Sequence, residues 1–250
     1  FDLSLQPKPD AYFVKSMFTD EPTVHIGVIE KSGGNIQWNG INVSAGKLSE
    51  NWNREAGEQV SLYTYTNGDE VELFLNGKSL GVKKNSNDPK LRARIKWDNI
   101  AYAPGTLVAV AKKNGKVVDR HQIETTGEAV ALKLVPDMET WHADGKDLMH
   151  VRIYAVDKKG RRVLNVKDAK AFDKLTFTVK GDANIVAVDN GNIASDELHI
   201  GKTQLEKSIQ RNLFQGSALV ILRAGDKPGK IELLVAGEKM KAKKLVLNTK

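Results

Sequence analysis

The chain has 250 residues, of which 40% are hydrophobic, so it is long enough for one large domain or two domains of ordinary size. Its 38 basic and 31 acidic residues give a net charge of +7 that is spread along the chain. A nucleic-acid binder concentrates its charge on one face with aromatic residues interleaved, so we predict no nucleic-acid partner. The lack of cysteine excludes disulfides and cysteine-ligated metal centres, and no run of roughly eighteen apolar residues is present that could form a membrane-spanning helix.

The N-terminal segment differs from the β-rich remainder. Phe1 to Gln6 does not resemble a signal peptide and the first residue is not Met, so we expect the chain to begin inside a longer polypeptide. Pro7 to Asp10 is a turn that can begin a helix. Ala11 to Phe18 has apolar residues at mixed helical spacing, which predicts one or two helical turns.

The next segments carry the first candidate ligands. Thr23 to Ile29 is apolar and β-branched, which predicts a strand. It contains His25, which we interpret as a packed or solvated residue rather than a metal ligand, because no partner ligands lie at useful spacing. Lys31 to Glu58 is rich in Gly, Asn and Ser and predicts a long loop. Trp52 in this loop could stack on a sugar or anchor the loop to a sandwich, and we favour the anchor because isolated aromatic residues more often bury area than bind ligand.

The strongest local pattern lies between Tyr65 and Gly81. Val71, Leu73 and Leu75 alternate with more polar neighbours, the period of two that defines a half-buried strand. Asn-Gly pairs stand on both sides of this strand, at Asn67-Gly68 and Asn76-Gly77. Because Asn-Gly tolerates positive φ, we expect a hairpin at each end.

Two motifs in this stretch resemble catalytic ones. Gly77 to Gly81 matches the G-x-S-x-G pattern of a nucleophile elbow, but that motif needs a helix directly after Ser79 and the sequence predicts a short strand and a loop there. Glu70 and Glu72 would lie roughly 6.5–7 Å apart along a strand, close to the spacing of paired glycosidase carboxylates. An open strand face lacks the unlike environments that split two pKa values, so we interpret them as solvated charges and predict no catalytic residue.

Further alternating segments bounded by turns predict an all-β fold. In the first half they are Glu58 to Thr66, Leu91 to Ile100, Thr106 to Ala111 and Val117 to Ile123, with a primed turn at Asn114-Gly115. In the second half they are Ala131 to Val135, Leu148 to Val156, Leu175 to Val179, Ile185 to Val188, Ala218 to Ala224, Lys230 to Val235 and Lys243 to Leu247. This spacing predicts two tandem immunoglobulin-like β-sandwiches, over residues 21–127 and 128–250.

Cofactor and metal signals are weak. Asp189 to Asn192 is rich in oxygen but lacks the spaced acidic ligands and terminal bidentate Glu of a calcium loop, so a plain turn is favoured. His142 and His150 do not form an H-E-x-x-H motif, and no glycine-rich dinucleotide fingerprint occurs. The sequence predicts no cofactor and no metal.

Several stretches together resemble a known family. They are Pro7 to Ser16, Pro22 to Ile26, Asn51 to Asn53, Tyr65 to Gly81 and Ala103 to Leu107 in the first half, and Ala143 to Leu148, Val186 to Asn192 and Lys227 to Ile231 in the second. They are similar to the region that follows the catalytic barrel in bacterial β-galactosidases of glycoside hydrolase family 2. The second-half motifs also occur in adhesin-like bacterial sandwiches.

The resemblance implies a non-catalytic role. It makes residues 1–20 a remnant of the end of the barrel, and it places both catalytic glutamates on that barrel, the acid/base preceded by asparagine. No Asn-Glu dipeptide occurs in this chain. We therefore expect an inactive C-terminal accessory region whose partners are the upstream barrel and the parent enzyme's carbohydrate substrate, in a periplasmic or surface-facing location. The alternatives are a stand-alone carbohydrate-binding module, with Trp52 as its sugar contact, or an adhesin-like interaction module.

Overall fold

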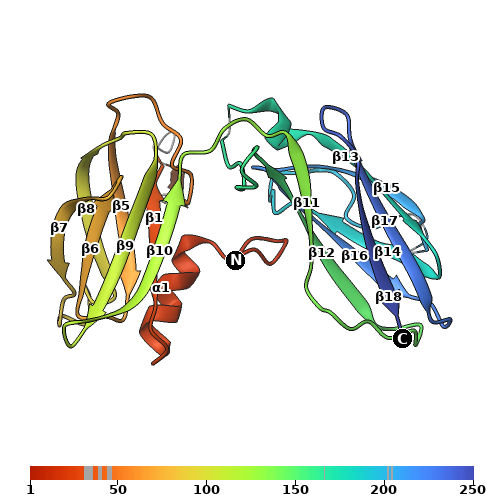
Figure 1. Ribbon diagram of the computed structural model, residues 1–250, viewed down its shortest axis with the longest axis horizontal. Coiled ribbons are helices and arrows are strands. Elements are labelled where there is room, and N and C mark those ends of the chain that lie inside the picture. The colour runs from red at the N-terminus through yellow and green to blue at the C-terminus, as the bar shows by residue number, and fades with distance from the viewer. Residues whose placement is uncertain (31–35, 39–40, 44–46, 166, 202, 204) are drawn as a thin grey trace. The chain divides into compact units, whose positions relative to one another are not determined.

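The computed structural model describes residues 1–30, 36–38, 41–43, 47–165, 167–201, 203 and 205–250 (Figure 1). It divides into two compact units, which we call the first sandwich, Pro7–Thr125, and the second sandwich, Thr126–Lys250 together with Phe1–Gln6. Each unit is built around two antiparallel four-stranded sheets. The predicted all-β fold with two tandem sandwiches is therefore confirmed.

The first sandwich packs one sheet of order β4-β1-β5-β8 against one of order β10-β9-β6-β7. The strands of the first sheet are β1 (Val24–Ile29), β4 (Leu48–Ser49), β5 (Gln59–Thr66) and β8 (Arg94–Ala101). Those of the second are β6 (Glu70–Leu75), β7 (Lys78–Lys84), β9 (Thr106–Lys113) and β10 (Lys116–Glu124). Val71 and Leu73 are fully buried between the sheets, as their alternation predicted.

Part of the predicted loop from Lys31 to Glu58 is ordered into short strands. Strands β2 (Ile36–Trp38) and β3 (Ile41–Val43) pair with each other, and β4 pairs with the end of β1. Residues 31–35, 39–40 and 44–46 of this segment lie outside the described residues. The predicted strand from Leu91 starts later, at Arg94, because Leu91 is exposed and Ala93 adopts a left-handed φ of 63°.

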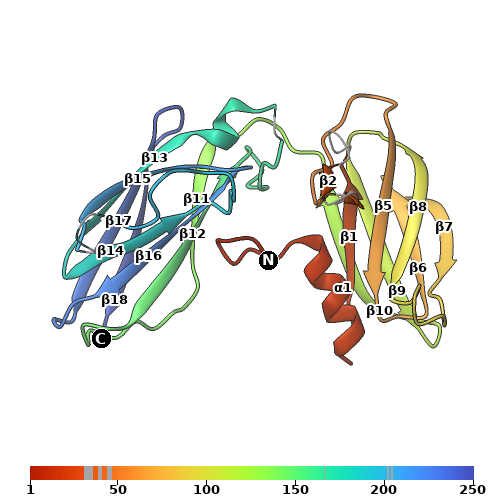
Figure 2. The same ribbon diagram turned by 180° about the vertical axis from the view of Figure 1, so that it is seen from behind.

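Helix α1 (Pro9–Phe18) covers the outer face of the β1 and β5 region, as Figure 2 shows. It begins two residues earlier than predicted because Pro9 occupies the first helical turn, where its missing N–H is not needed. Tyr65 of β5 lies under the helix, 5.6 Å from Phe13 between ring centroids, and its hydroxyl donates to Asp10. Among the described residues, no helix has the length and hydropathy needed to cross a membrane.

The two Asn-Gly pairs behave differently. Asn76 and Gly77 have φ values of 51° and 80° and form the predicted hairpin between β6 and β7. The hairpin predicted at Asn67-Gly68 is wrong, because β5 and β6 belong to opposite sheets. There the side chain of Asn67 joins backbone segments instead, accepting from the amide of Thr23 and donating to the carbonyls of Thr19 and Glu21.

The second sandwich has sheets of order β11-β12-β16-β14 and β15-β13-β17-β18. Its strands are β11 (Ala131–Pro136), β12 (Leu148–Val156), β13 (Lys174–Lys180), β14 (Ala183–Asp189), β15 (Ser208–Asn212), β16 (Ser217–Ala224), β17 (Gly229–Gly237) and β18 (Lys243–Thr249). A short 3-10 helix, η1 (Ala169–Phe172), precedes β13. Strand β15 has no counterpart among the predicted segments. Trp141 and Phe177 are among the largest fully buried side chains of its core.

The first six residues belong to the second sandwich, although they precede α1 in the chain. The Asp2 carboxylate accepts from the amides of Ser4 and Gln6 and fixes a small loop. Arg152 of β12 donates to the carbonyl of Ser4, and the Tyr154 hydroxyl donates to Gln6. The segment 1–20 is thus divided between the two units, and its origin at the end of a barrel stays a prediction.

Candidate functional site

Ser79 occupies a strand rather than an elbow. It is the second residue of β7, which continues as a strand through Lys84. The Ser79 hydroxyl is exposed and donates to Oε1 of Glu72 at 2.9 Å. The strand-turn-helix context of a nucleophile elbow is therefore replaced here by a hairpin.

The Glu70 and Glu72 pair lies on the outward face of β6. The Glu72 carboxylate accepts from Nζ of Lys112 at 3.0 Å and from Ser79. The hydrogen bond from Lys112, followed by that from Ser79, lowers the pKa of Glu72. A glycosidase acid needs a raised pKa, so these contacts fit the prediction of solvated surface charges.

Trp52 is buried in the core of the first sandwich. Its exposed fraction is 0%, and its ring packs edge-to-face against Tyr102 with centroids 5.3 Å apart. The anchoring role that the sequence favoured accounts for this burial. A sugar has no access to the ring face in this conformation, and the sugar contact at Trp52 stays a prediction.

The side-chain oxygens of the Asp189 to Asn192 turn accept hydrogen bonds from neighbouring protein groups. Oδ1 of Asp189 accepts from the amide of Gly191, and Oδ1 of Asn190 accepts from the amide of Asn192 and from the buried guanidinium of Arg211. The Asn190 amide also donates to the carbonyl of Asn212. These hydrogen bonds stabilise the turn.

The cluster that the structure does bring together is His25, Glu50 and His121. His25 comes from β1, His121 from β10, and Glu50 from the segment after β4. Nε2 of His25 lies 2.8 Å from Oε1 of Glu50, and Nε2 of His121 lies 3.8 Å from the same oxygen. His25 is only 3% exposed. Our premise that no partner ligands lie at useful spacing in the sequence did not reveal this cluster, because both partners come from distant parts of the chain.

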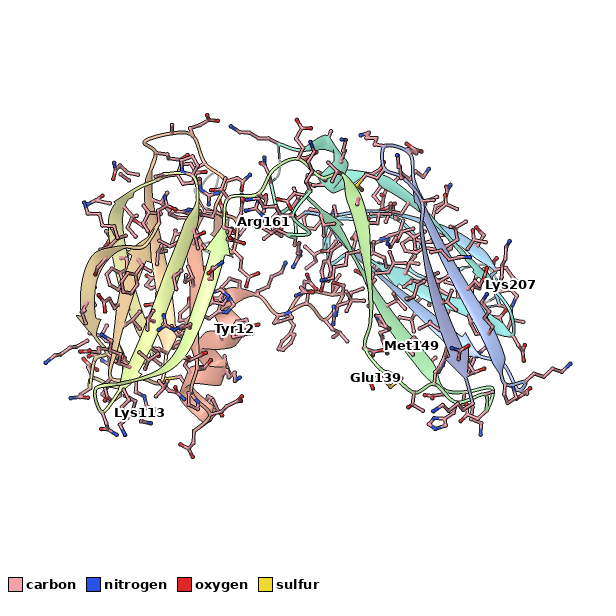
Figure 3. All side chains as sticks on the ribbon, viewed as in Figure 1. Tyr12, Lys113, Glu139, Met149, Arg161 and Lys207 are labelled. Carbon is pink, nitrogen blue, oxygen red and sulfur yellow. The ribbon has the colours of Figure 1, made fainter. Side chains whose placement is uncertain are left out.

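Aromatic rings enclose His25 on both faces. Tyr12 of α1, labelled in Figure 3, stacks on His25 with centroids 3.5 Å apart and an interplanar angle of 4°. The ring of His121 is the second ring in contact with His25, with centroids 3.9 Å apart and an interplanar angle of 34°. Burial, then the nearby Glu50 carboxylate, raises the pKa of Tyr12. The cluster thus joins α1, β1 and β10.

Side chains of β10 also complete the edge of β1. Strand β4 pairs with Val28 and Ile29, so the amides of Val24 and Ile26 lie beyond this pairing. The Val24 amide donates to Oδ2 of Asp119 at 2.7 Å, and the Ile26 amide donates to Nδ1 of His121 at 3.1 Å. Two side chains of the opposite sheet thereby satisfy backbone donors of β1 in the part of the strand that β4 does not reach.

The same contact decides whether the cluster suits a metal ion. Its ligand-type atoms lie within 4.8 Å of one another. However, Nδ1 of His121 accepts a hydrogen bond, so in the neutral ring the proton is on Nε2, the atom that would have to bind the metal. A metal-bound His normally donates through its other nitrogen. The present arrangement therefore does not fit a resident metal.

Comparisons with known proteins place this fold in a family. The model named "Glycoside hydrolase family 2 C-terminal domain 5" matches residues 132–246, and a domain of unknown function, DUF4982, matches residues 57–119. Beta-galactosidase BoGH2A of Bacteroides ovatus is 33% identical over 238 residues, which are 95% of this chain and 24% of that protein. This chain belongs to glycoside hydrolase family 2.

Two further proteins match over 71% and 99% of this chain. A beta-glucuronidase of Formosa agariphila is 30% identical over 179 residues, covering 71% of this chain and 15% of that protein. The crystal structure of a family 2 member from Bacteroides cellulosilyticus superposes with a TM-score of 0.81 at 28% identity, covering 99% of this chain and 31% of that one. This family 2 chain therefore spans a quarter or less of the length of these curated relatives.

Proposed function

We propose that this chain is a non-catalytic accessory region of a family 2 glycosidase that acts on β-galactosides or β-glucuronides. The proposal is supported by the match of 95% of the chain to a β-galactosidase, and by further matches to β-glucuronidases. It is also supported by the lack of an Asn-Glu dipeptide, which the resemblance to the family associates with the catalytic acid/base. We extend the proposal to a periplasmic or surface-facing location, which rests on the resemblance alone.

The outer side of α1 is the observation that carries the accessory role. The helix buries Pro9 and Ser16, while Val14 is 55% and Phe18 84% exposed. Exposed apolar residues grouped on one helix indicate a surface that another part of a protein covers. The partners we propose are the catalytic barrel of the same polypeptide and the carbohydrate substrate of the parent enzyme.

Turnover of model substrates tests the non-catalytic role. We expect the purified 250-residue chain to release no chromophore from aryl β-galactosides or aryl β-glucuronides. A family 2 enzyme that contains its barrel serves as the positive control. Turnover that survives repurification of the chain and is lost in the Glu72→Gln variant would contradict the proposal.

Sugar binding separates the accessory role from a stand-alone carbohydrate-binding module. Titration calorimetry with galactosides, glucuronides and polysaccharides is expected to give no heat of binding, because Trp52 is buried. A binding module predicts heat that Trp52→Ala abolishes. Because this truncation removes a large core side chain and costs about 3–5 kcal/mol, Trp52→Phe serves as the matched variant, with circular dichroism to verify folding.

A further inference from the structure

We propose that His25, Glu50 and His121 form a proton-sensitive clasp, in which protonation of His121 breaks the side-chain bond that closes the edge of β1 and weakens the seating of α1. The inference concerns a conformational response of the first sandwich. It does not depend on the activity of any enzyme to which the chain belongs.

The clasp joins the two sheets of the first sandwich. Strand β1 belongs to one sheet and β10 to the other. The amide of Ile26 donates to His121 and that of Val24 donates to Asp119, two residues away on the same face of β10. These bonds replace a neighbouring strand along the first half of β1, so their loss would leave the Val24 and Ile26 amides without their partners.

The bond to His121 exists only while this imidazole is neutral. Nδ1 can accept from the Ile26 amide when it carries no proton. A proton on Nδ1 would place one N–H donor against another at 3.1 Å. Protonation therefore converts the contact from attraction to repulsion.

The surroundings of His121 decide when this happens. His25 of β1 and Glu50 of the segment after β4 face His121, and Asp119 lies on the same strand. Tyr12 of α1 stacks on the His25 ring. Burial, and then the charge of His25, lower the pKa of His121 to about 4, although Glu50 opposes this shift. The buried neutral form is thus the one that the fold selects.

His25 transmits the change to α1. Its ring lies between those of Tyr12 and His121, at centroid distances of 3.5 Å and 3.9 Å. Displacement of a charged His121 removes the ring surface against which His25 packs. Since Tyr12 stacks on His25, the helix loses one of its contacts to the sandwich.

The sign of the pH effect follows from the lowered pKa. Unfolded His121 takes up its proton near pH 6.5 and folded His121 near pH 4, so the unfolded state binds more protons between these values. The stability supplied by the clasp is complete above about pH 6.5. It falls as the pH decreases, with the unfolding constant rising about tenfold for each pH unit until about pH 4.

His121→Asn is the decisive variant. The Oδ1 of Asn occupies the position of the imidazole Nδ1 and can accept from the Ile26 amide, but it does not titrate. We expect the ratio of wild-type to variant unfolding constants to rise about tenfold per pH unit below pH 6.5. The measurement is urea unfolding of the full chain, followed by hydrogen-exchange mass spectrometry on peptides of the first sandwich. His142→Asn, at an exposed histidine of the second sandwich, is the matched control and should leave these peptides unchanged.

Nuclear magnetic resonance of the wild-type chain tests the clasp without a variant. We expect the His121 ring to titrate below pH 5 and the Ile26 amide to lose protection with the same midpoint. A His121 midpoint at or above 6.5, or equal pH dependence in wild type and His121→Asn, would overturn the proposal. So would micromolar zinc that shifts the His25 and His121 signals together, because the cluster would then be a metal site.

Discussion

Asp157 of the second sandwich shows how one buried carboxylate can hold several groups in place. Its two oxygens accept from the backbone amides of Gly127, Lys159 and Arg161 and from the Arg161 guanidinium. Burial alone would raise the pKa of Asp157, but the hydrogen bonds from the Arg161 side chain and the three amides outweigh it and lower the pKa to about 2. The Gly127 contact fixes the chain where it enters the second sandwich.

Replacing this carboxylate has a predictable cost. We expect Asp157→Asn to destabilise the second sandwich by about 2 kcal/mol at pH 7, because charge-assisted hydrogen bonds are lost and Arg161 is left without its partner. Since the folded pKa is lowered, the difference from wild type is complete above about pH 4 and disappears as the pH falls towards 2. Urea unfolding across this pH range measures it.

The exposed pair of Lys96 and Asp98 provides the control for Asp157. Asp98→Asn should change stability much less, because 46% of its side chain is exposed and solvent screens the pair. A pH-independent difference between Asp157→Asn and wild type would show that the carboxylate charge is not what stabilises this turn.

Turns at one end of the first sandwich illustrate coupling between elements. Asn76, in the turn between β6 and β7, accepts through Oδ1 from the Thr106 amide and donates through Nδ2 to the Pro104 carbonyl. It thereby fastens the turn between β8 and β9. Gly105 in that second turn has a φ of 135°, and a Cβ there would lie 1.9 Å from Oδ1 of Asn76. The glycine is required both by its conformation and by this close approach.

Two matched alanine substitutions test this coupling. In Gly77→Ala the added Cβ would contact no other atom, and the only cost is the strain of an alanine at a φ of 80°. We therefore expect the free energy of unfolding to fall by about 1 kcal/mol. Gly105→Ala also displaces the Asn76 amide and its two hydrogen bonds, and we expect about 3 kcal/mol. Thermal unfolding of both variants gives the comparison, and equal losses would show that the Asn76 bridge contributes nothing.

The elements differ in how well the sequence predicts them, for a physical reason. Strands such as β5 and β12 were located to within one residue because buried and exposed side chains alternate along them. Strand β15 was missed because its inward position holds Arg211, a fully buried cation bound to Asn190 and to the carbonyl of Glu197. The alternation of apolar and polar residues does not reveal a strand such as β15, which backbone pairing and a polar network hold in place.

The His25 cluster marks the limit of sequence reasoning for the site. His25, Glu50 and His121 have no motif spacing, since their meeting depends on the packing of β1 against β10. Trp52 was recognised as an anchor or a sugar contact, and only coordinates reveal its burial. The burial of residues within one strand can be predicted from the alternation of its side chains, whereas contacts between residues of two different sheets cannot.

At the scale of the whole molecule, each sandwich has a core of its own. Trp52, Leu62 and Leu73 are fully buried in the first, and Trp141, Phe177 and Ile153 in the second. Separate cores of this size are the feature that defines independent domains. The chain passes from one unit to the other at Gln6–Pro7 and again at Thr125–Thr126.

The placement of Phe1–Gln6 in the second sandwich bears on how the protein is made. A ribosome delivers these six residues before the first sandwich, whereas Arg152 and Tyr154, which hold them, emerge only after it is complete. Phe1–Gln6 must therefore wait through the synthesis of an entire domain before the side chains that hold them exist. The time that these six residues spend exposed to solvent therefore depends on the speed of translation, because the strand that binds them is synthesised later.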